Sequence, residues 1–490
     1  MRIAKLTAAL VAAGLTLPAI AAPDTATLQK ILDRMEKLEA RNADLEKEVK
    51  ALKGENEQIA KGLNSTRLSE NEPELTVRLK AVEQDALEMK KAASIAEKLD
   101  GIKVGAALTT VAQKAYGLPK DTTASDSQLN YRADVTVELP LQPMGDIEHK
   151  VFTHFRMGQG QGLNKTFSNL GYFSSAPNAV AFRASGANAD DSVAILGEAW
   201  YQASIPLPMG GFRPNSREKL ELTFGKMDIF GFFDQNTAAG DESKQFLNSV
   251  FIHNPLLDAG GEVAVDANGF QPGFITSYLN ESDKNEPWRL SLGVFGAGDK
   301  GSNYQRTLNG PLIMAQAEKQ LKLFGGLTGN YRAYAWTRSE VSELNQSTTT
   351  RHTGLGLSID QRVGDGINLF GRYGQLIKGE LSFDKALSIG AEINGSYWGR
   401  GADAIGLGGS WLSSSNAFRK AGGSGDVNGD GVAEFTYTPS GAENIAEIYY
   451  RYRISPQFEI TPDFQWVTRG GANPDAKNIS VFGLRANISY

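Results

Sequence analysis

The residue pattern closest to a metal site is a calcium-type loop near the end of the chain. Asp426, Asn428 and Asp430, with glycines at 429 and 431, follow the D-x-N-x-D-G opening in which oxygen ligands hold Ca²⁺. The twelfth position is Tyr437, instead of the glutamate that closes such a loop with both carboxylate oxygens. An ordinary turn rich in glycine and aspartate accounts for the same residues. We therefore expect no bound metal and keep this loop only as a weak calcium candidate.

Residue patterns typical of catalysis are missing from the sequence. The chain has no cysteine, which removes thiol catalysis, disulfides and thiolate metal ligands. The four histidines, at 149, 154, 253 and 352, lack the spacing of metal ligands. We find no nucleophile elbow, phosphate-binding loop or pair of carboxylates in a catalytic context. The sequence predicts neither an enzyme nor a cofactor.

The other candidate residues are polar side chains that alternate with apolar ones. Period-two alternation predicts a β-strand, because successive side chains leave a strand on opposite faces. Between 195 and 205 the apolar face carries Ile195, Ala199, Tyr201, Ala203 and Ile205, and the polar face carries Glu198, Trp200, Gln202 and Ser204. The polar faces of the C-terminal strands carry Arg451, Arg453 and Arg485. If the polar faces surround water, we expect Glu198, Trp200, Gln202, Arg451, Arg453 and Arg485 to line it. For each residue taken singly, the alternative is an ordinary water-facing position on the inner wall.

Alternation of this kind continues from residue 101 to residue 490. It predicts about sixteen strands, an even number, as in the closed barrels of single bacterial chains. The predicted strands lie near 102–112, 129–141, 148–158, 193–205, 218–227, 271–280, 287–296, 311–320, 323–337, 352–362, 366–376, 385–396, 402–412, 446–454, 458–466 and 482–490.

The large number of long, half-apolar strands indicates whether their apolar faces point out of or into the barrel. A soluble barrel would turn the apolar faces inward, but the chain has little other apolar material to complete such a core. A membrane barrel needs no such core, because its apolar faces contact lipid and its polar faces contact water. Closure of the barrel also removes unpaired strand edges. We therefore expect an all-β outer-membrane barrel of about sixteen antiparallel strands over 101–490. A secreted β-helix or adhesin is the alternative.

The N-terminus predicts export. Arg2 and Lys5 give a positive start, Leu6 to Leu17 are apolar, and Ala19-Ile20-Ala21 is a cleavage motif, so 1–21 is a predicted signal peptide. The apolar run is too short to span a bilayer as a helix, although an uncleaved anchor is the alternative. Export and strands together predict the Gram-negative outer membrane, with lipid as a partner. The net charge of −6 argues against nucleic acid.

Residues 22–98 are predicted to form an α-helical coiled-coil arm in the periplasm. From Leu28 to Leu63 the seam positions step by three and four over five heptads, with Asn42 and Asn56 at a positions. Such a seam predicts a homo-oligomer. Asparagine at a favours a dimer, but a trimeric membrane domain would override this, and we favour the trimer. One amphipathic helix packed on a core is the alternative.

Connections between the strands alternate in length. Those at 142–147, 281–286, 363–365 and 455–457 are short and predicted to be periplasmic, whereas 159–191, 228–268, 297–310, 338–351 and 413–442 are long. The 228–268 loop can form a short helix over 241–254. Folded inward, it would narrow a pore, with Asp234, Asn236, Asp241 and Glu242 as constriction candidates. A helix packed on an extracellular cap is the alternative.

Four stretches resemble the carbohydrate-selective porin family (OprB-like) of Gram-negative outer membranes. They are LGEAWYQASIPL (196–207), LELTFGKMDIFGFFDQN (220–236), QFLNSVFIHNP (245–255) and EIYYRYRISPQFEITPDFQWV (447–467). The resemblance covers roughly 190–490 and implies a sixteen-stranded, trimeric, passive channel for sugars and other small polar solutes. The arm is not part of the family's core pattern, and Tyr490 replaces the more usual terminal phenylalanine.

These observations predict an outer-membrane porin through which small polar solutes, carbohydrates preferred, diffuse passively. The alternative is a structural outer-membrane protein whose coiled coil links the membrane to the cell wall, since a simple channel does not need such an arm.

Overall fold

The computed structural model describes residues 43, 47, 49–54, 101–119, 125–168, 176–182, 192–208, 216–258, 269–296, 310–345, 348–422, 426, 433 and 435–490. The chain divides into two compact units, Met1–Asp100 and Gly101–Tyr490. In the first unit the described residues are helical. The predicted signal peptide and most of the predicted coiled coil lie outside the described residues, so both stay predictions.

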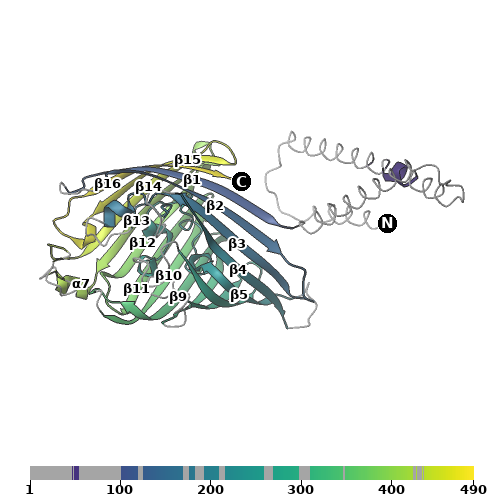
Figure 1. Cartoon of the computed structure of the whole chain (residues 1–490), viewed down its shortest axis with the longest axis horizontal. Coiled ribbons are helices and arrows are strands. Elements are labelled where there is room, and N and C mark those ends of the chain that lie inside the picture. Colours follow the sequence, from purple (N-terminus) through teal and green to yellow (C-terminus); the bar gives the residue numbers. More distant parts are fainter. Residues whose placement is uncertain are drawn as a thin grey trace, which may run out of the picture. The chain divides into compact units, whose positions relative to one another are not determined.

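The second unit is a closed antiparallel β-barrel (Figure 1). Each strand pairs with its neighbours in the sequence, and β1 closes the barrel on β16, with Ala107 opposite Ser489 and Tyr116 opposite Ser480. The predicted sixteen-strand barrel is confirmed. Its strands are β1 (Lys103–Tyr116), β2 (Ser127–Pro140), β3 (Glu148–Gln159), β4 (Val193–Leu207), β5 (Glu218–Asp228), β6 (Phe270–Asn280), β7 (Trp288–Phe295), β8 (Leu312–Leu323), β9 (Leu327–Ser342), β10 (Thr349–Gly364), β11 (Ile367–Lys378), β12 (Phe383–Asn394), β13 (Ala404–Ser414), β14 (Ala442–Arg453), β15 (Phe458–Thr468) and β16 (Ile479–Ser489).

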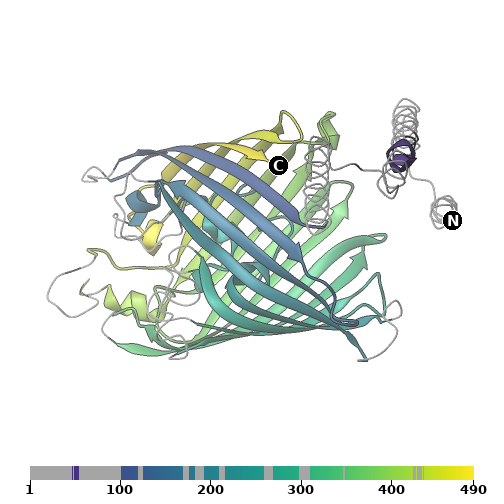
Figure 2. The same cartoon turned by 45° about the vertical axis from the view of Figure 1, so that its right-hand side comes forward.

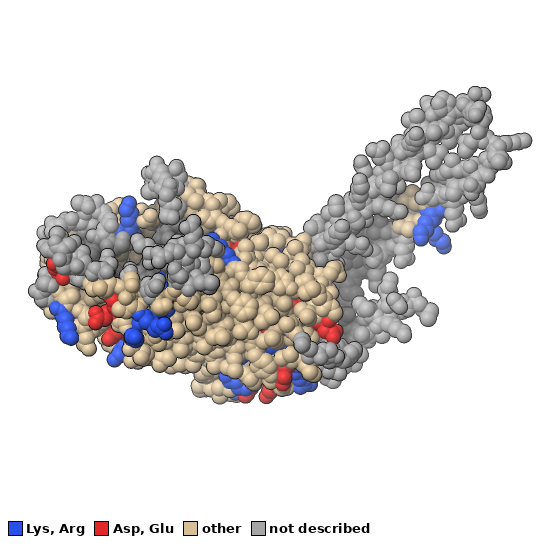
Figure 3. All heavy atoms as spheres, turned by 60° about the horizontal axis from the view of Figure 1, so that its bottom comes forward, with Lys and Arg blue, Asp and Glu red and all other residues tan. Residues whose placement is uncertain are grey.

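The outer face of the barrel is apolar and the inner face is polar. On β16, Phe482, Leu484 and Ile488 are 50–53% exposed, whereas Arg485 and Asn487 between them are buried. Figure 3 shows a broad uncharged band on one side of the barrel, with charged side chains near its margins. This reverses the pattern of a water-soluble protein and suits a surface that contacts lipid.

Strand β4 departs from the predicted alternation. The pairing of β3 with β4 shifts between His154, opposite Glu198, and Phe155, opposite Leu196, so Gly197 forms a β-bulge. A bulge places two residues against one and reverses the faces beyond it. Leu196, at 44% exposure, therefore takes the outer face, and the prediction that Ile195 shares a face with Ala199 is wrong.

Short helices occupy the connections. They are α4 (Asn164–Ser168), η3 (Ile229–Gly231), α5 (Ser249–Ile252), α6 (Pro255–Asp258), η6 (Gly395–Trp398), α7 (Asn416–Ala421) and η7 (Gly470–Ala472). Among the described residues, no helix has both the length and the apolar character needed to cross a bilayer.

Residues 229–258, between β5 and β6, fill part of the barrel interior, and we call them the inner segment. Phe246 and Phe251 of this segment are fully buried and pack against Phe370 of β11, while Phe246 also contacts Tyr449 of β14. Figure 2 shows the tilted strands wrapped around this ribbon. The predicted helix over 241–254 is shorter than expected, since only Ser249–Ile252 is helical.

Candidate functional site

A cluster of charged side chains lies on the inner face of β2, β3 and β4. At its centre, Asp134 Oδ2 accepts from Arg132 Nε at 2.8 Å, and Asp134 Oδ1 accepts from Arg156 Nε at 2.7 Å. His154 Nε2 contacts Asp134 Oδ1 at 2.8 Å, and its Nδ1 lies 3.3 Å from Glu198 Oε1. The alternation of each strand turns these groups inward, because Ala133, Phe155 and Met157 take the outer face. The result is a wall with charges of both signs.

Glu242 brings the inner segment to this wall. Its Oε1 lies 2.9 Å from Arg132 Nη1, and the Glu242 side chain keeps 19% of its surface exposed. Burial alone would raise the pKa of the Glu242 carboxyl, but the positive charges of Arg132 and Arg156 outweigh it and lower that pKa below the ordinary 4.5. Glu242 is therefore ionised at neutral pH. We call Arg132, Asp134, His154, Arg156, Glu198 and Glu242 the charged ring.

The predicted residues of β4 stand beside one another. Trp200 Nε1 donates to Glu198 Oε2 at 3.1 Å, and Gln202 Nε2 donates to Thr223 Oγ1 at 3.0 Å. Trp200 stacks on Phe152 with ring centroids 4.9 Å apart, and Lys150 Nζ lies 5.6 Å from its ring. Aromatic surface therefore borders the charged ring.

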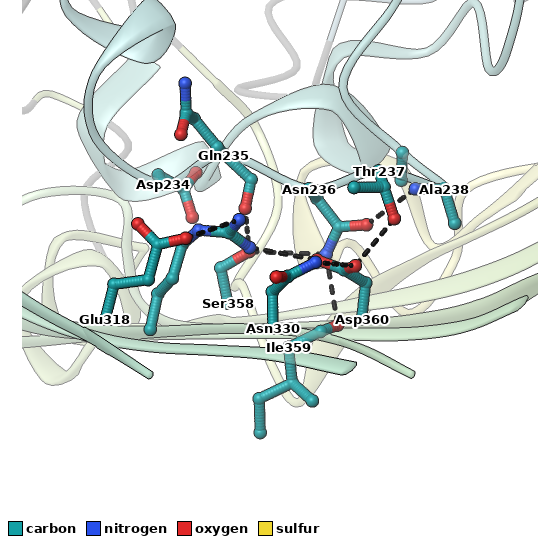
Figure 4. A network of polar contacts seen from close by, with 12 residues as sticks. Asp234, Gln235, Asn236, Thr237, Ala238, Glu318, Asn330, Ser358, Ile359 and Asp360 are labelled. Carbon is teal, nitrogen blue, oxygen red and sulfur yellow. Dashed lines mark hydrogen bonds and ion pairs between the residues drawn. The ribbon is translucent and has the colours of Figure 1, made fainter. Parts of the chain in front are cut away.

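Asn236 of the inner segment contacts the opposite wall. Asn236 Nδ2 donates to Ile359 O at 3.0 Å and to Ser358 Oγ at 3.3 Å on β10, and neighbouring Thr237 donates to Asp360 Oδ1 at 2.6 Å (Figure 4). Asp360 also accepts from Asn330 and pairs with Arg332, which in turn pairs with Glu318. Asp234, two residues earlier, is fully buried and pairs with Arg372 of β11 at 2.9 Å.

The C-terminal arginines are spread over the barrel. Arg485 is fully buried and its Nη1 donates to Glu242 O at 2.9 Å and Gln245 O at 2.7 Å, both on the inner segment. Arg451 Nη1 lies 3.6 Å from Glu392 Oε2 on β12. Arg453, at the end of β14, is exposed, and its Nη2 donates to Pro456 O in the following turn. The structure therefore does not bring Arg453 together with the other two.

The remaining candidates have local roles or cannot be placed. Asp241 Oδ1 accepts from Ser243 N at 2.9 Å and from Ser243 Oγ at 2.5 Å, which shapes a turn of the inner segment. Of the calcium-type loop, Asp426 is described, but Asn428 and Asp430 lie outside the described residues. Within the described part of the chain, no group of three or more acidic or histidine side chains is arranged to hold a metal.

Sequence reasoning missed Arg132, Asp134, His154, Arg156 and Arg372. A signal for the first four was present. In RADV (132–135) and THFRM (153–157) the charged or imidazole side chains alternate with the apolar residues Ala133, Val135, Phe155 and Met157, as the inner face of a membrane strand requires. No local signal marks Arg372 as the partner of Asp234, because the two lie 138 residues apart.

The charged ring can do hydrogen-bond chemistry with a neutral polar solute. Arginines supply fixed donors and carboxylates supply acceptors, while every sugar hydroxyl can serve as both. Nearby Trp200 and Phe152 offer apolar surface suited to the C–H faces of a sugar ring.

Comparison with known proteins agrees with this geometry. Residues 132–490 match the model of the carbohydrate-selective porin, OprB family. An uncharacterized protein of Aquifex aeolicus is 28% identical over 334 residues, which is 68% of this chain and 80% of the relative. The high-pH structure of Pseudomonas putida OprB superposes with a TM-score of 0.63 at 18% identity, covering 81% of this chain and 97% of that chain, and shows the same fold. The chain therefore belongs to the carbohydrate-selective porin, OprB family, and is an outer-membrane porin.

Proposed function

We propose that this porin lets small neutral carbohydrates diffuse passively across the outer membrane, and that the charged ring selects them. The observation that carries the proposal is the contact of Glu242 with Arg132, because it brings the inner segment against a wall that holds donors and acceptors together. The family match over residues 132–490 supports the carbohydrate class.

Selection of neutral sugars follows from the balance of charge. Arg132 and Arg156 stand against Asp134, Glu198 and Glu242, so neither sign dominates over a few ångströms. A sugar can replace the water on these groups with its own hydroxyls, bond for bond, whereas an ion of either sign meets a like charge. Discrimination therefore comes from hydrogen bonding.

We propose that Glu198, Trp200, Gln202 and Arg451 line the path or its margin, and that Arg453 acts at its mouth. Arg485, a pore-lining candidate from the sequence, is fully buried, and we propose that it holds the inner segment against β16. For the inner segment, we propose that Glu242 faces the solute, while Asp234, Asn236 and Asp241 hold the segment's shape. These roles are supported by the partial exposure of Glu242 and the burial of Asp234 and Asn236.

Beyond the barrel, we propose that residues 22–98 form the coiled-coil arm in the periplasm and that the protein is a homo-oligomer, with a trimer favoured over a dimer. The heptad seam supports both proposals.

Liposome swelling tests the function. Proteoliposomes are exposed to sugars of rising size and to amino acids of matched size. We expect monosaccharides to enter fastest, and faster than zwitterionic amino acids of similar volume. Absence of swelling with any solute would overturn the channel, and equal rates for sugars and amino acids would overturn the carbohydrate preference.

A further inference from the structure

Arg372 on β11 contacts three separate points of the inner segment. Its Nε donates to Asp234 Oδ1 at 2.9 Å, and its Nη2 donates to Asp234 O at 3.0 Å and Ala239 O at 3.2 Å. Its Nη1 donates to Phe251 O at 2.5 Å. The Arg372 side chain is 1% exposed and that of Asp234 is fully buried. One guanidinium thus ties together backbone that is 17 residues apart, from Asp234 to Phe251.

Asp234 completes the same arrangement from the side of the segment. Its Oδ1 also accepts from Tyr334 OH of β9 at 2.9 Å, and its Oδ2 accepts from Asn254 N at 2.7 Å. Its own N donates to Gln316 Oε1 of β8 at 3.0 Å. The residue has a φ of +54°, a left-handed conformation that costs energy for a side chain other than glycine. These contacts hold a turn that would otherwise relax.

From this geometry we infer that the Arg372–Asp234 pair is a clamp that fixes how far the inner segment extends into the pore, and so sets the largest sugar that passes. The inference rests on the proposed function. Arg372 and Asp234 are positioning residues, because both are buried beneath the segment and act on solute only through the place where Glu242 stands.

The opposite wall does not replace the clamp. There Glu447 accepts from Leu247 N at 2.5 Å and from Asn248 N at 3.0 Å, and Arg485 donates to Glu242 O and Gln245 O. These bonds fix residues 242–248, but none of them reaches the groups that Arg372 holds at Asp234, Ala239 and Phe251. Without the guanidinium, Ala239 O and Phe251 O lose a buried donor, and the Asp234 carboxylate loses its counter-charge. Buried acceptors without partners recruit water, so the segment moves away from β11.

The test compares Arg372→Met and Arg372→Lys with the parent protein. Arg289→Met is the matched control, because Arg289 also pairs with a carboxylate across strands, Glu221 at 3.1 Å, without belonging to the clamp. Single-channel conductance and liposome swelling with mono-, di- and trisaccharides give the size limit. Heat modifiability on gels shows that the barrel is closed. If Arg372→Met fails to close, the double variant D234N/R372M removes both buried charges and takes its place.

We expect the methionine variant to conduct at least about twice as much as the parent and to admit a larger sugar. The lysine variant should fall between them, because an ammonium reaches the Asp234 carboxylate but cannot make all four bonds. A closed barrel with an unchanged size limit, or an equal change in Arg289→Met, would overturn the clamp. A parent protein that passes no sugar would instead overturn the proposed function.

Discussion

At the scale of single residues, an ion pair between Glu242 and Arg132 links the inner segment to the barrel wall. Removing the negative partner as Glu242→Gln keeps the shape and subtracts one charge from the charged ring. At about 4 Å in water one unit charge changes the energy of a monovalent ion by about 1 kcal/mol, or roughly fivefold in permeation. We therefore expect the cation-to-anion permeability ratio to fall by up to about fivefold.

The zero-current potential in a KCl gradient measures this ratio. Because the pKa of Glu242 lies below 4.5, the difference between parent and variant should persist when the pH is lowered from 7 to 5. Asp475→Asn, which removes an exposed carboxylate from the connection between β15 and β16, is the control and should leave the ratio unchanged. An unaltered permeability ratio in Glu242→Gln would contradict the proposal that Glu242 faces the permeating solute.

A second residue-scale prediction concerns Asp403, just before β13. Its carboxylate accepts from Arg400 Nε and from Tyr450 OH, each at 2.5 Å, and from Arg453 N at 3.0 Å. Burial would raise its pKa, but the hydrogen bonds from Arg400 and Tyr450 lower the pKa from 3.8 to about 2. A lowered pKa means that the carboxylate stabilises the fold above pH 4 and loses this effect as the pH falls toward 2.

Thermal unfolding of the parent and of Asp403→Asn, followed by gel shift, measures this effect. We expect the variant to unfold at a lower temperature than the parent at pH 5 to 8. The difference between the two unfolding temperatures, which we call the gap, should narrow between pH 4 and pH 2. Asp365→Asn, at an exposed turn, should show no gap. A gap that stays constant down to pH 2 would contradict the role of the ionised carboxylate.

At the scale of elements, Gly408 on the inner face of β13 makes room for the inner segment. A Cβ on Gly408 would lie 2.8 Å from Phe251 Cε1 and 2.9 Å from Phe246 Cε1, whereas one on Gly409 would meet nothing within 4 Å. Gly408→Val should lower the free energy of unfolding by about 1–3 kcal/mol, the usual cost of overpacking, and Gly409→Val should not. Denaturant unfolding in lipid vesicles measures the free energy of unfolding of both variants. Equal effects of the two substitutions would contradict the close packing of Gly408 against Phe246 and Phe251.

The predicted coiled-coil arm can be tested as an element of its own. Deleting 27–98 should reduce the mass of the protein in detergent from that of a homo-oligomer, measured by light scattering after gel filtration. Leu45→Lys, at a seam position, should act in the same direction, and Glu46→Lys on the flank should not. An unchanged mass after the deletion would show that the arm does not hold subunits together. A weakened envelope in cells would favour the link to the cell wall.

The positions of the strands and the orientation of their faces were predictable, because apolar and polar side chains alternate within each strand. Both C-terminal arginines that alternate with apolar residues through β14 and β16, Arg451 and Arg485, lie on the inner side. The bulge at Gly197 was not predictable from the alternation of β4. A Cβ at Gly197 would lie 2.7 Å from Phe270 Cζ, and this contact with a residue far along the chain leaves no periodic signal. The residues that bind the inner segment were not predicted for a similar reason. They belong to strands far along the chain, and the periodicity of a strand gives no information about which distant side chains pair with each other.

At the scale of the whole molecule, the barrel divides its tasks between two surfaces. The outer surface presents side chains such as Leu484 and Trp466, 51% and 46% exposed, whose transfer into lipid is favourable. The inner surface keeps polar groups in contact with one another, with the inner segment and with water. Buried apolar side chains also lie inside the barrel, and among them Phe246 and Phe251 pack the inner segment against the wall at Phe370.

The contacts that hold the inner segment in place also indicate when it takes up its position during folding. Asn248 bonds Gln465 across 217 residues, and Arg485 bonds Glu242 across 243. Such distant partners meet only after the intervening chain has been ordered, and loop closure of this length is slow. The inner segment can therefore make these contacts only once β15 and β16 are in place, which puts its final seating late in folding.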